Sequence, residues 1–86
     1  MDKLPRWSGR KIISVFKKEG WTVDRIEGSH YIMVKAGTEE ILVIPVHGNK
    51  PIRVGLLKGL IKDAGLTNEE FLRLCYKKRR REKRGL

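Results

Sequence analysis

The chain has 86 residues, and its 20 Lys and Arg residues outnumber its 10 Asp and Glu residues, which gives a formal net charge of +10 at pH 7. A domain this short buries only about 60% of the surface of its unfolded chain, so we expect a shallow surface site rather than a large enclosed active-site cavity. The positive charge favours a polyanionic partner, with nucleic acid ahead of an acidic protein and of a membrane surface.

The first predicted element is a helix over residues 9–19. Ser8 precedes it and can cap it, because a serine hydroxyl accepts hydrogen bonds from the free amides of the first turn. Apolar residues recur at helical spacing and predict one buried stripe: Ile12, Ile13, Val15 and Phe16. Gly20 follows and predicts the end of the helix, since glycine readily adopts the left-handed conformation found after many helices.

Three strands are predicted next, over residues 21–26, 30–35 and 41–46. The turns between them have hairpin length, which makes the sheet antiparallel. In the second strand the alternation places His30, Ile32 and Val34 on one face of the sheet. Pro45 indicates that the third strand ends there or lies at an edge, because proline donates no backbone hydrogen bond.

Two further helices are predicted. The first runs over residues 54–64, and its apolar side comprises Leu56, Leu57, Leu60, Ile61 and Ala64. Thr67 and Glu70 have the spacing of a capping box, which predicts a short third helix directly after Thr67. The fold class is therefore α+β, in the order helix, three antiparallel strands, helix, helix. The helices are expected to cover one face of the sheet and to leave the other open to a partner.

Basic residues concentrate at the C-terminal end, where residues 77–84 carry seven positive side chains and one negative. Of the total charge of +10, this leaves +4 on the rest of the chain. The sequence thus predicts a single domain over residues 1–76 and a basic tail over residues 77–86. The tail is either a solvated extension or a sequence-independent contact to phosphates.

Cys75 is the only cysteine, so no intrachain disulfide is possible and a reducing, cytoplasmic location is expected. Its apolar neighbours indicate a small core residue rather than a nucleophile. We expect no signal peptide, because the N-terminus is charged and lacks a continuous apolar stretch. No membrane span is expected either, since no run approaches the roughly 20 apolar residues that a bilayer requires.

His30 follows a predicted Gly28-Ser29 turn and opens a predicted strand. RNA carries its own nucleophile, the 2′-hydroxyl, and its cleavage needs a base for that proton and an acid for the departing 5′-oxygen. Imidazole suits both roles, because its unperturbed pKa is about 6.5, and no metal ion or other cofactor is required. A lone strand histidine is more often structural, but the basic composition and the hairpin setting favour chemistry on RNA.

His47, in the predicted loop after the third strand, is the second histidine of the chain. It is either the partner of His30 in an acid–base pair or a loop residue that positions RNA or a protein. Two histidines and one core thiol fall short of the usual ligand set of zinc, so no metal site is predicted. The sequence also contains no phosphate-binding glycine loop and no dinucleotide fingerprint.

Six basic residues of the body are candidate contacts to RNA phosphates: Arg10, Lys11, Lys35, Lys50, Arg53 and Lys58. The alternative is an ordinary solvated surface, and the sequence does not rank these residues. Trp7 and Tyr31 are candidates for stacking on bases.

An ordered set of short motifs over nearly all of residues 4–74 resembles the HicA (YcfA-like) toxin family of toxin–antitoxin pairs. The early motifs are Leu4-Pro5, Ser8-Gly9-Arg10-Lys11, Glu19-Gly20-Trp21 and Gly28-Ser29-His30. The later ones are Ile44-Pro45-Val46-His47, Gly55-Leu56-Leu57, Asp63-Ala64-Gly65-Leu66-Thr67 and Glu69-Glu70-Phe71-Leu72. No single motif is decisive, but the ordered set is specific. The basic tail after Tyr76 is not part of the family pattern.

The resemblance implies a double-stranded-RNA-binding-like fold, in agreement with the predicted order of elements. It also implies an endoribonuclease that cleaves mRNA and stops translation. The family's catalytic histidine falls on His30, with Gly28 and Ser29 shaping its turn. A HicB-type antitoxin would neutralise the protein by covering this site. We expect no small-molecule cofactor and no membrane partner.

Two other interpretations stay open at this point. A non-catalytic RNA-binding module would bind RNA with the same salt sensitivity but leave it intact. A pure partner-binding domain would bind an acidic protein and lose its affinity for RNA once charge is screened. Cleaved RNA distinguishes the enzyme from both.

Overall fold

The computed structural model describes residues 3–77. Its elements are α1 (Gly9–Lys18), β1 (Thr22–Glu27), β2 (His30–Val34), β3 (Leu42–Pro45), α2 (Val54–Asp63) and α3 (Asn68–Tyr76). The predicted α+β class and the predicted order are both confirmed. Apart from Lys77, the predicted basic tail lies outside the described residues.

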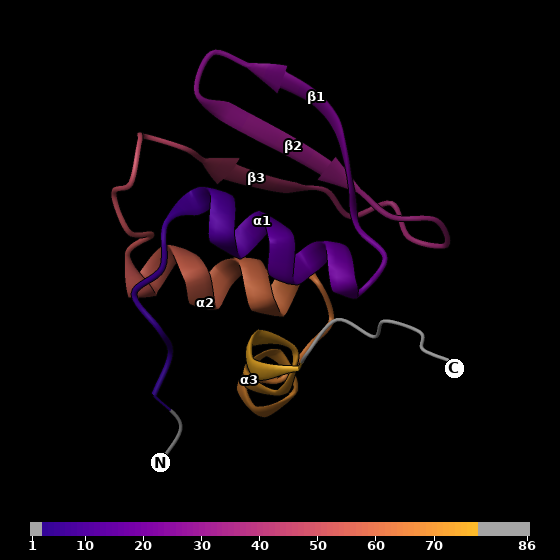
Figure 1. The fold of residues 1–86 in the computed structure, drawn as a ribbon. Helices are drawn as coiled ribbons and strands as arrows, with labels where there is room; N and C mark the ends of the chain where they lie inside the picture. Colours follow the sequence, from indigo (N-terminus) through magenta and orange to yellow (C-terminus); the bar gives the residue numbers. More distant parts are fainter. Residues whose placement is uncertain (1–2, 78–86) are drawn as a thin grey trace, which may run out of the picture.

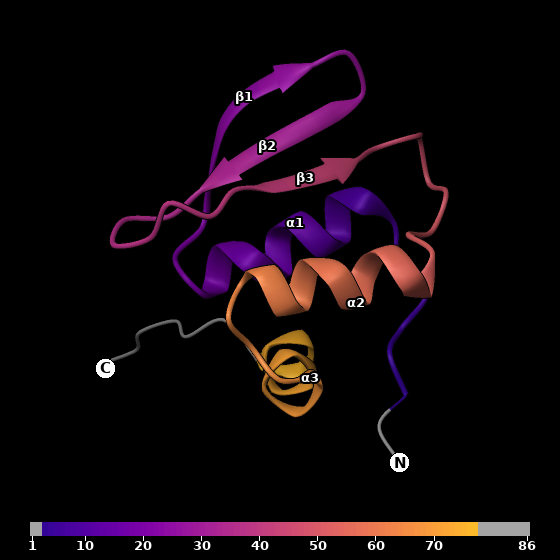
Figure 2. The ribbon, with the colours of Figure 1, turned by 180° about the vertical axis from the view of Figure 1, so that it is seen from behind.

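The molecule consists of a twisted sheet with helices on one side (Figure 1). The strands are antiparallel and adjacent in chain order, β1-β2-β3. Helices α1 and α2 lie against one face of the sheet, and α3 packs beneath these two helices, away from the sheet. The opposite face, which we call the open face, is not covered by any of these three helices, as Figure 2 also shows.

The core lies between the sheet and α1 and α2 and continues to α3. Phe16 and Phe71 are fully buried, and their ring centroids are 5.4 Å apart. Trp21 is also buried, and Met33 and Leu42 supply the sheet side of the core. Burying a large apolar side chain of this kind stabilises the fold by about 1.5–3 kcal/mol.

Capping interactions define the ends of the helices. The Ser8 hydroxyl accepts a hydrogen bond from the Lys11 amide at 3.3 Å, and Gly20 follows α1 with a φ of 104°. The capping box predicted for Thr67 and Glu70 is present at the start of α3. At the other end of α3, the Lys18 ammonium donates to the carbonyl oxygens of Leu74 at 2.8 Å and of Lys77 at 2.9 Å. The end of α1 is thereby tied to the end of α3.

One predicted helix face needs correction. Leu56 was expected on the buried side of α2, but its side chain is 41% exposed. The helix instead buries Leu57, Leu60 and Ile61. Within the described part of the chain, no helix is long and apolar enough to cross a membrane.

Candidate functional site

His30 is the first residue of β2 and is exposed on the open face of the sheet. The preceding turn contains Gly28 in the left-handed region, with a φ of 61°, which a glycine adopts without steric cost. In the sheet register His30 lies opposite Glu27 on β1 and opposite Pro45 on β3. The imidazole therefore stands between two neighbouring strands at the hairpin end of the sheet.

The backbone around His30 is held from both sides. The Val46 amide donates a hydrogen bond to the Ser29 carbonyl at 2.8 Å, which continues the pairing of β2 with β3 beyond Pro45. On the other side, His30 pairs with Glu27 of β1, next to the turn of the β1–β2 hairpin. Gly28 and Ser29 form the two-residue turn between β1 and β2, and the backbone of His30 follows directly from it.

His47 lies at the same end of the sheet as His30. It follows β3 by two residues and is exposed. Its neighbour Val46 is bonded to Ser29, so the backbone places the two histidines on adjoining segments. The β3–α2 loop then turns through a hydrogen bond from the Lys50 amide to the His47 carbonyl at 3.0 Å.

Helix α1 begins directly beside this end of the sheet. Gly9 packs against Val46 and against the carbonyl of Pro45, the β3 partner of His30. The guanidinium of Arg10 lies 5.9 Å from the centre of the Tyr31 ring, next to His30 in sequence. Arg10 is on α1 and Tyr31 packs against the core, so this contact lies on the helix-covered face of the sheet, opposite the face that carries His30.

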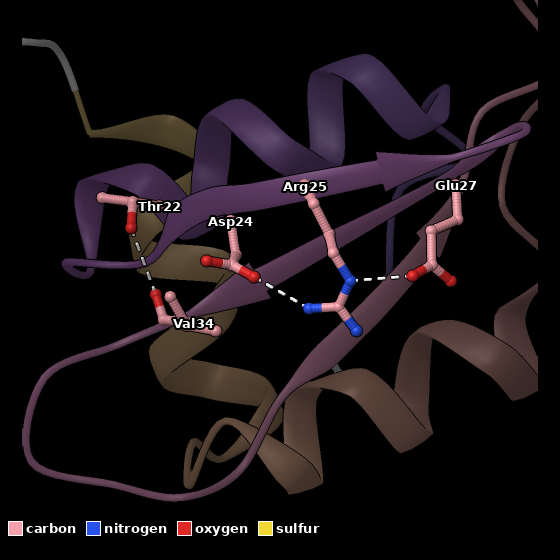
Figure 3. A network of polar contacts seen from close by, with 5 residues as sticks. All are labelled: Thr22, Asp24, Arg25, Glu27 and Val34. Atoms are coloured by element: carbon pink, nitrogen blue, oxygen red, sulfur yellow. Dashed lines mark hydrogen bonds and ion pairs between the residues drawn. The ribbon is translucent and has the colours of Figure 1, made fainter.

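Arg25, on the open face, is held by two carboxylates (Figure 3). Its guanidinium donates to Glu27 at 2.7 Å and to Asp24 at 2.8 Å. These hydrogen bonds, that of Glu27 first, raise the pKa of Arg25. The arrangement depends on a register shift between Val23 and Arg25, a bulge that changes the alternation of β1.

Glu27 was not among the predicted site residues. Glu27 is directly opposite His30 in the register, where Cβ atoms are about 4.5–5.5 Å apart, and its carboxylate is hydrogen-bonded to Arg25. The signal was present in the sequence, because Glu27 and His30 flank the two-residue turn on either side. Hairpin geometry alone pairs such residues.

The six predicted phosphate contacts do not form one cluster. Arg53 and Lys58 line the same cavity beside α2, and Lys50 precedes them in the β3–α2 loop. The ammonium of Lys11 lies 4.3 Å from the centre of the Trp7 ring. Lys35 lies beyond the far end of β2, where it pairs with Glu19 at 3.3 Å, so it is separated from His30 by the length of the strand.

Cys75 is buried, as predicted for a core residue. Burial raises the pKa of its thiol to about 11, so the thiol is protonated at neutral pH and is a poor nucleophile. Among residues 3–77, no group of three or more His, Cys, Asp or Glu side chains is placed to hold a metal ion.

Comparison with known proteins identifies the family. A search among curated proteins returned no match. The profile of the family described as "HicA toxin of bacterial toxin-antitoxin" matches residues 9–66, which is more than half of the chain and includes His30 and His47. The chain belongs to the HicA toxin family of bacterial toxin–antitoxin systems.

Proposed function

We propose that this toxin is a metal-independent endoribonuclease that cleaves mRNA and thereby inhibits translation. The observation that carries the proposal is the position of His30, which is exposed at a hairpin of a basic protein and held by backbone pairs on both sides. An imidazole in this setting is accessible to RNA, and its backbone is fixed before RNA binds.

The reaction requires two proton transfers. A base takes the proton of the 2′-hydroxyl, and the 2′-oxygen bonds to the adjacent phosphorus. The bond from phosphorus to the 5′-oxygen then breaks, and that oxygen takes a proton from an acid. The products are a 2′,3′-cyclic phosphate and a 5′-hydroxyl end. We assign one of these transfers to His30, and His47 is the candidate for the other because it lies on the adjoining segment.

Basic residues around the histidines would hold the RNA. Lys50 lies in the loop that follows His47, and Arg10 lies near the start of α1, against Tyr31 on the helix-covered face. Glu27 and Asp24 neutralise Arg25 on the open face, so this arginine contributes less net positive charge than its sequence suggests. We therefore place the RNA strand over the open face at His30 and toward the β3–α2 loop.

Membership in a toxin–antitoxin family implies an antitoxin as partner, and we propose one of the HicB type that covers His30. The open face offers room for it. Val43 is 39% exposed on this face, in the same row as Arg25 and Ile32. An antitoxin bound there would bury this apolar surface and exclude RNA from the imidazole.

The decisive experiment compares purified wild-type protein with His30→Ala and His47→Ala variants on mRNA in the presence of a chelator. We expect the wild type to cleave without metal and His30→Ala to lose about 10²–10⁴ in rate while it retains its fold and its RNA affinity. An unchanged rate in His30→Ala would refute the assignment. Intact RNA bound by all three proteins would instead favour the non-catalytic RNA-binding module.

A further inference from the structure

A second basic feature lies beside the start of α2. A cavity of about 590 Å³ opens between the segment that precedes α1 and the segment that leads into α2. Four of its lining residues are cationic: Lys3, Arg6, Arg53 and Lys58. The other described lining residues are apolar or proline, and no carboxylate of residues 3–77 lines the cavity.

Backbone contacts hold the two walls of this cavity together. The Ile52 amide donates to the Trp7 carbonyl at 2.9 Å, and Ser8 forms an isolated antiparallel bridge with Pro51. The Ile52 side chain is buried in the core, which anchors the second wall. The two cationic segments are distant in sequence, so their convergence is a product of the fold.

These four charges are not compensated within the described structure. Arg25 and Lys35 each have a carboxylate partner, whereas none of the four cavity cations forms an ion pair with any of residues 3–77. Like charges gathered in this way repel one another, and a bound anion removes that repulsion. Two arginines among them favour phosphate, because the planar guanidinium matches two phosphate oxygens at once.

The cavity lies at the same end of the molecule as His30. In Figure 1 the β1–β2 turn, the β3–α2 loop, the start of α2 and the segment before α1 all follow the left edge, and in Figure 2 they follow the right edge. Pro45, the partner of His30, is six residues before Pro51, which lines the cavity. Six extended residues span at most about 20 Å, a length that a few nucleotides of single-stranded RNA can bridge.

We propose that this cavity binds backbone phosphates of the RNA strand a few nucleotides away from the bond at His30. The inference rests on the proposed function for the identity of the polyanion, and it adds a phosphate subsite that includes Lys3 and Arg6. The subsite binds sequence-independently, because its contacts are to phosphates rather than to base edges. The subsite holds the RNA strand in place while His30 acts on a bond a few nucleotides away.

The test measures binding rather than cleavage. In the His30→Ala background, the double variant Arg6→Gln/Arg53→Gln is compared with Lys17→Gln/Lys62→Gln, which removes the same charge from the exposed far ends of α1 and α2. Affinity for a single-stranded RNA is measured over a range of salt concentrations. A plot of log affinity against log salt has a negative slope, and each phosphate contact contributes about 0.7 to its steepness. For the cavity variant, which loses two contacts, we expect the slope to be less steep by about 1.4. For the control variant we expect a smaller change, and thermal unfolding should confirm that both are folded.

Two outcomes would overturn the inference. Equal changes in the two double variants would show that RNA senses only the total charge. The second outcome combines two results. If inorganic phosphate protects the cavity arginines from a reagent that modifies arginine side chains, and the cavity variant binds RNA as tightly as its parent, the cavity binds a free anion and not RNA. The result is independent of nuclease activity. A wild-type protein that binds RNA through this cavity without cutting it would refute the proposed function and leave the phosphate subsite standing.

Discussion

Gly9, the first residue of α1, lies against the backbone carbonyl oxygen of Pro45 so closely that a side chain at position 9 would overlap it. Pro45 is in turn the β3 partner of His30. The start of the first helix therefore supports the strand beside the imidazole, and glycine at this position is a requirement of packing, not of backbone conformation. This contact connects the core to the proposed active site.

A Gly9→Ala substitution should destabilise the protein by about 1–3 kcal/mol, because α1 and β3 must move apart to admit the methyl group. RNA cleavage should fall as well, since Pro45 positions the backbone opposite His30. Urea denaturation and a cleavage assay measure the two effects. The matched control is Gly59→Ala in α2, where the methyl group meets nothing within 4 Å. This control should raise the free energy of unfolding by about 0.5–1 kcal/mol, because alanine favours the helix more than glycine does. A Gly9→Ala protein with the stability of the wild type would contradict the packing described above.

Lys18 offers a test of the connection between α1 and α3. Replacing it with methionine keeps the aliphatic chain but removes the ammonium that bonds to the carbonyl oxygens of Leu74 and Lys77. Since the net value of a hydrogen bond is about 0.5–1.5 kcal/mol and this side chain is exposed, we expect a loss of about 1 kcal/mol. The neighbouring Lys17→Met variant serves as the control, and equal stability of the two variants in urea would show that the ammonium does not cap α3.

The buried thiol of Cys75 predicts a defined response to alkaline pH. Its pKa rises from 9.0 to about 11 in the folded protein, mainly because of burial. Between these values the unfolded chain has lost the thiol proton while the folded chain keeps it, so stability should fall as the pH rises through this interval. The contribution is fully present below pH 9. Comparing the pH dependence of unfolding in wild type and Cys75→Ala isolates it from the titration of lysines and tyrosines.

The same burial predicts slow reaction with thiol reagents at pH 8 in the native protein and rapid reaction once it is unfolded. A native thiol that reacts at the rate of a free cysteine would show that α3 opens readily. Lys18→Met is expected to raise the native rate, because it releases the end of α3 that carries Cys75.

Local signals in the sequence were sufficient to predict the order and type of the elements. Gly20 ends α1, the two-residue turn at Gly28 and Ser29 joins β1 to β2, and the Thr67 capping box begins α3. The alternation of β2 also separated His30 from Tyr31 and Met33, and the structure shows that the face of Tyr31 and Met33 is the one packed on the core. These features depend on neighbours in sequence, which is why the pattern predicts them.

Features that depend on tertiary contacts could not be predicted in this way. Leu56 and Leu57 are adjacent in the apolar run of α2, and only the packing of that helix decides which of them is buried. The bulge in β1 breaks the regular alternation of side chains, and an alternating pattern cannot predict it. The contacts of Arg25 with Asp24 and Glu27 were therefore not predicted. The basic cavity depends on the hydrogen bond from Ile52 to Trp7 and has no signature in either segment alone.

The exposed position of His30 has a genetic consequence under the proposed function. Because this side chain contributes nothing to the core, a single codon change can abolish catalysis and still yield a protein of native shape. Such a protein would continue to sequester its antitoxin. In a cell that carries both alleles, the inactive copy would leave the active one less well neutralised, so a loss-of-function mutation at this codon would be harmful until the functional allele is lost.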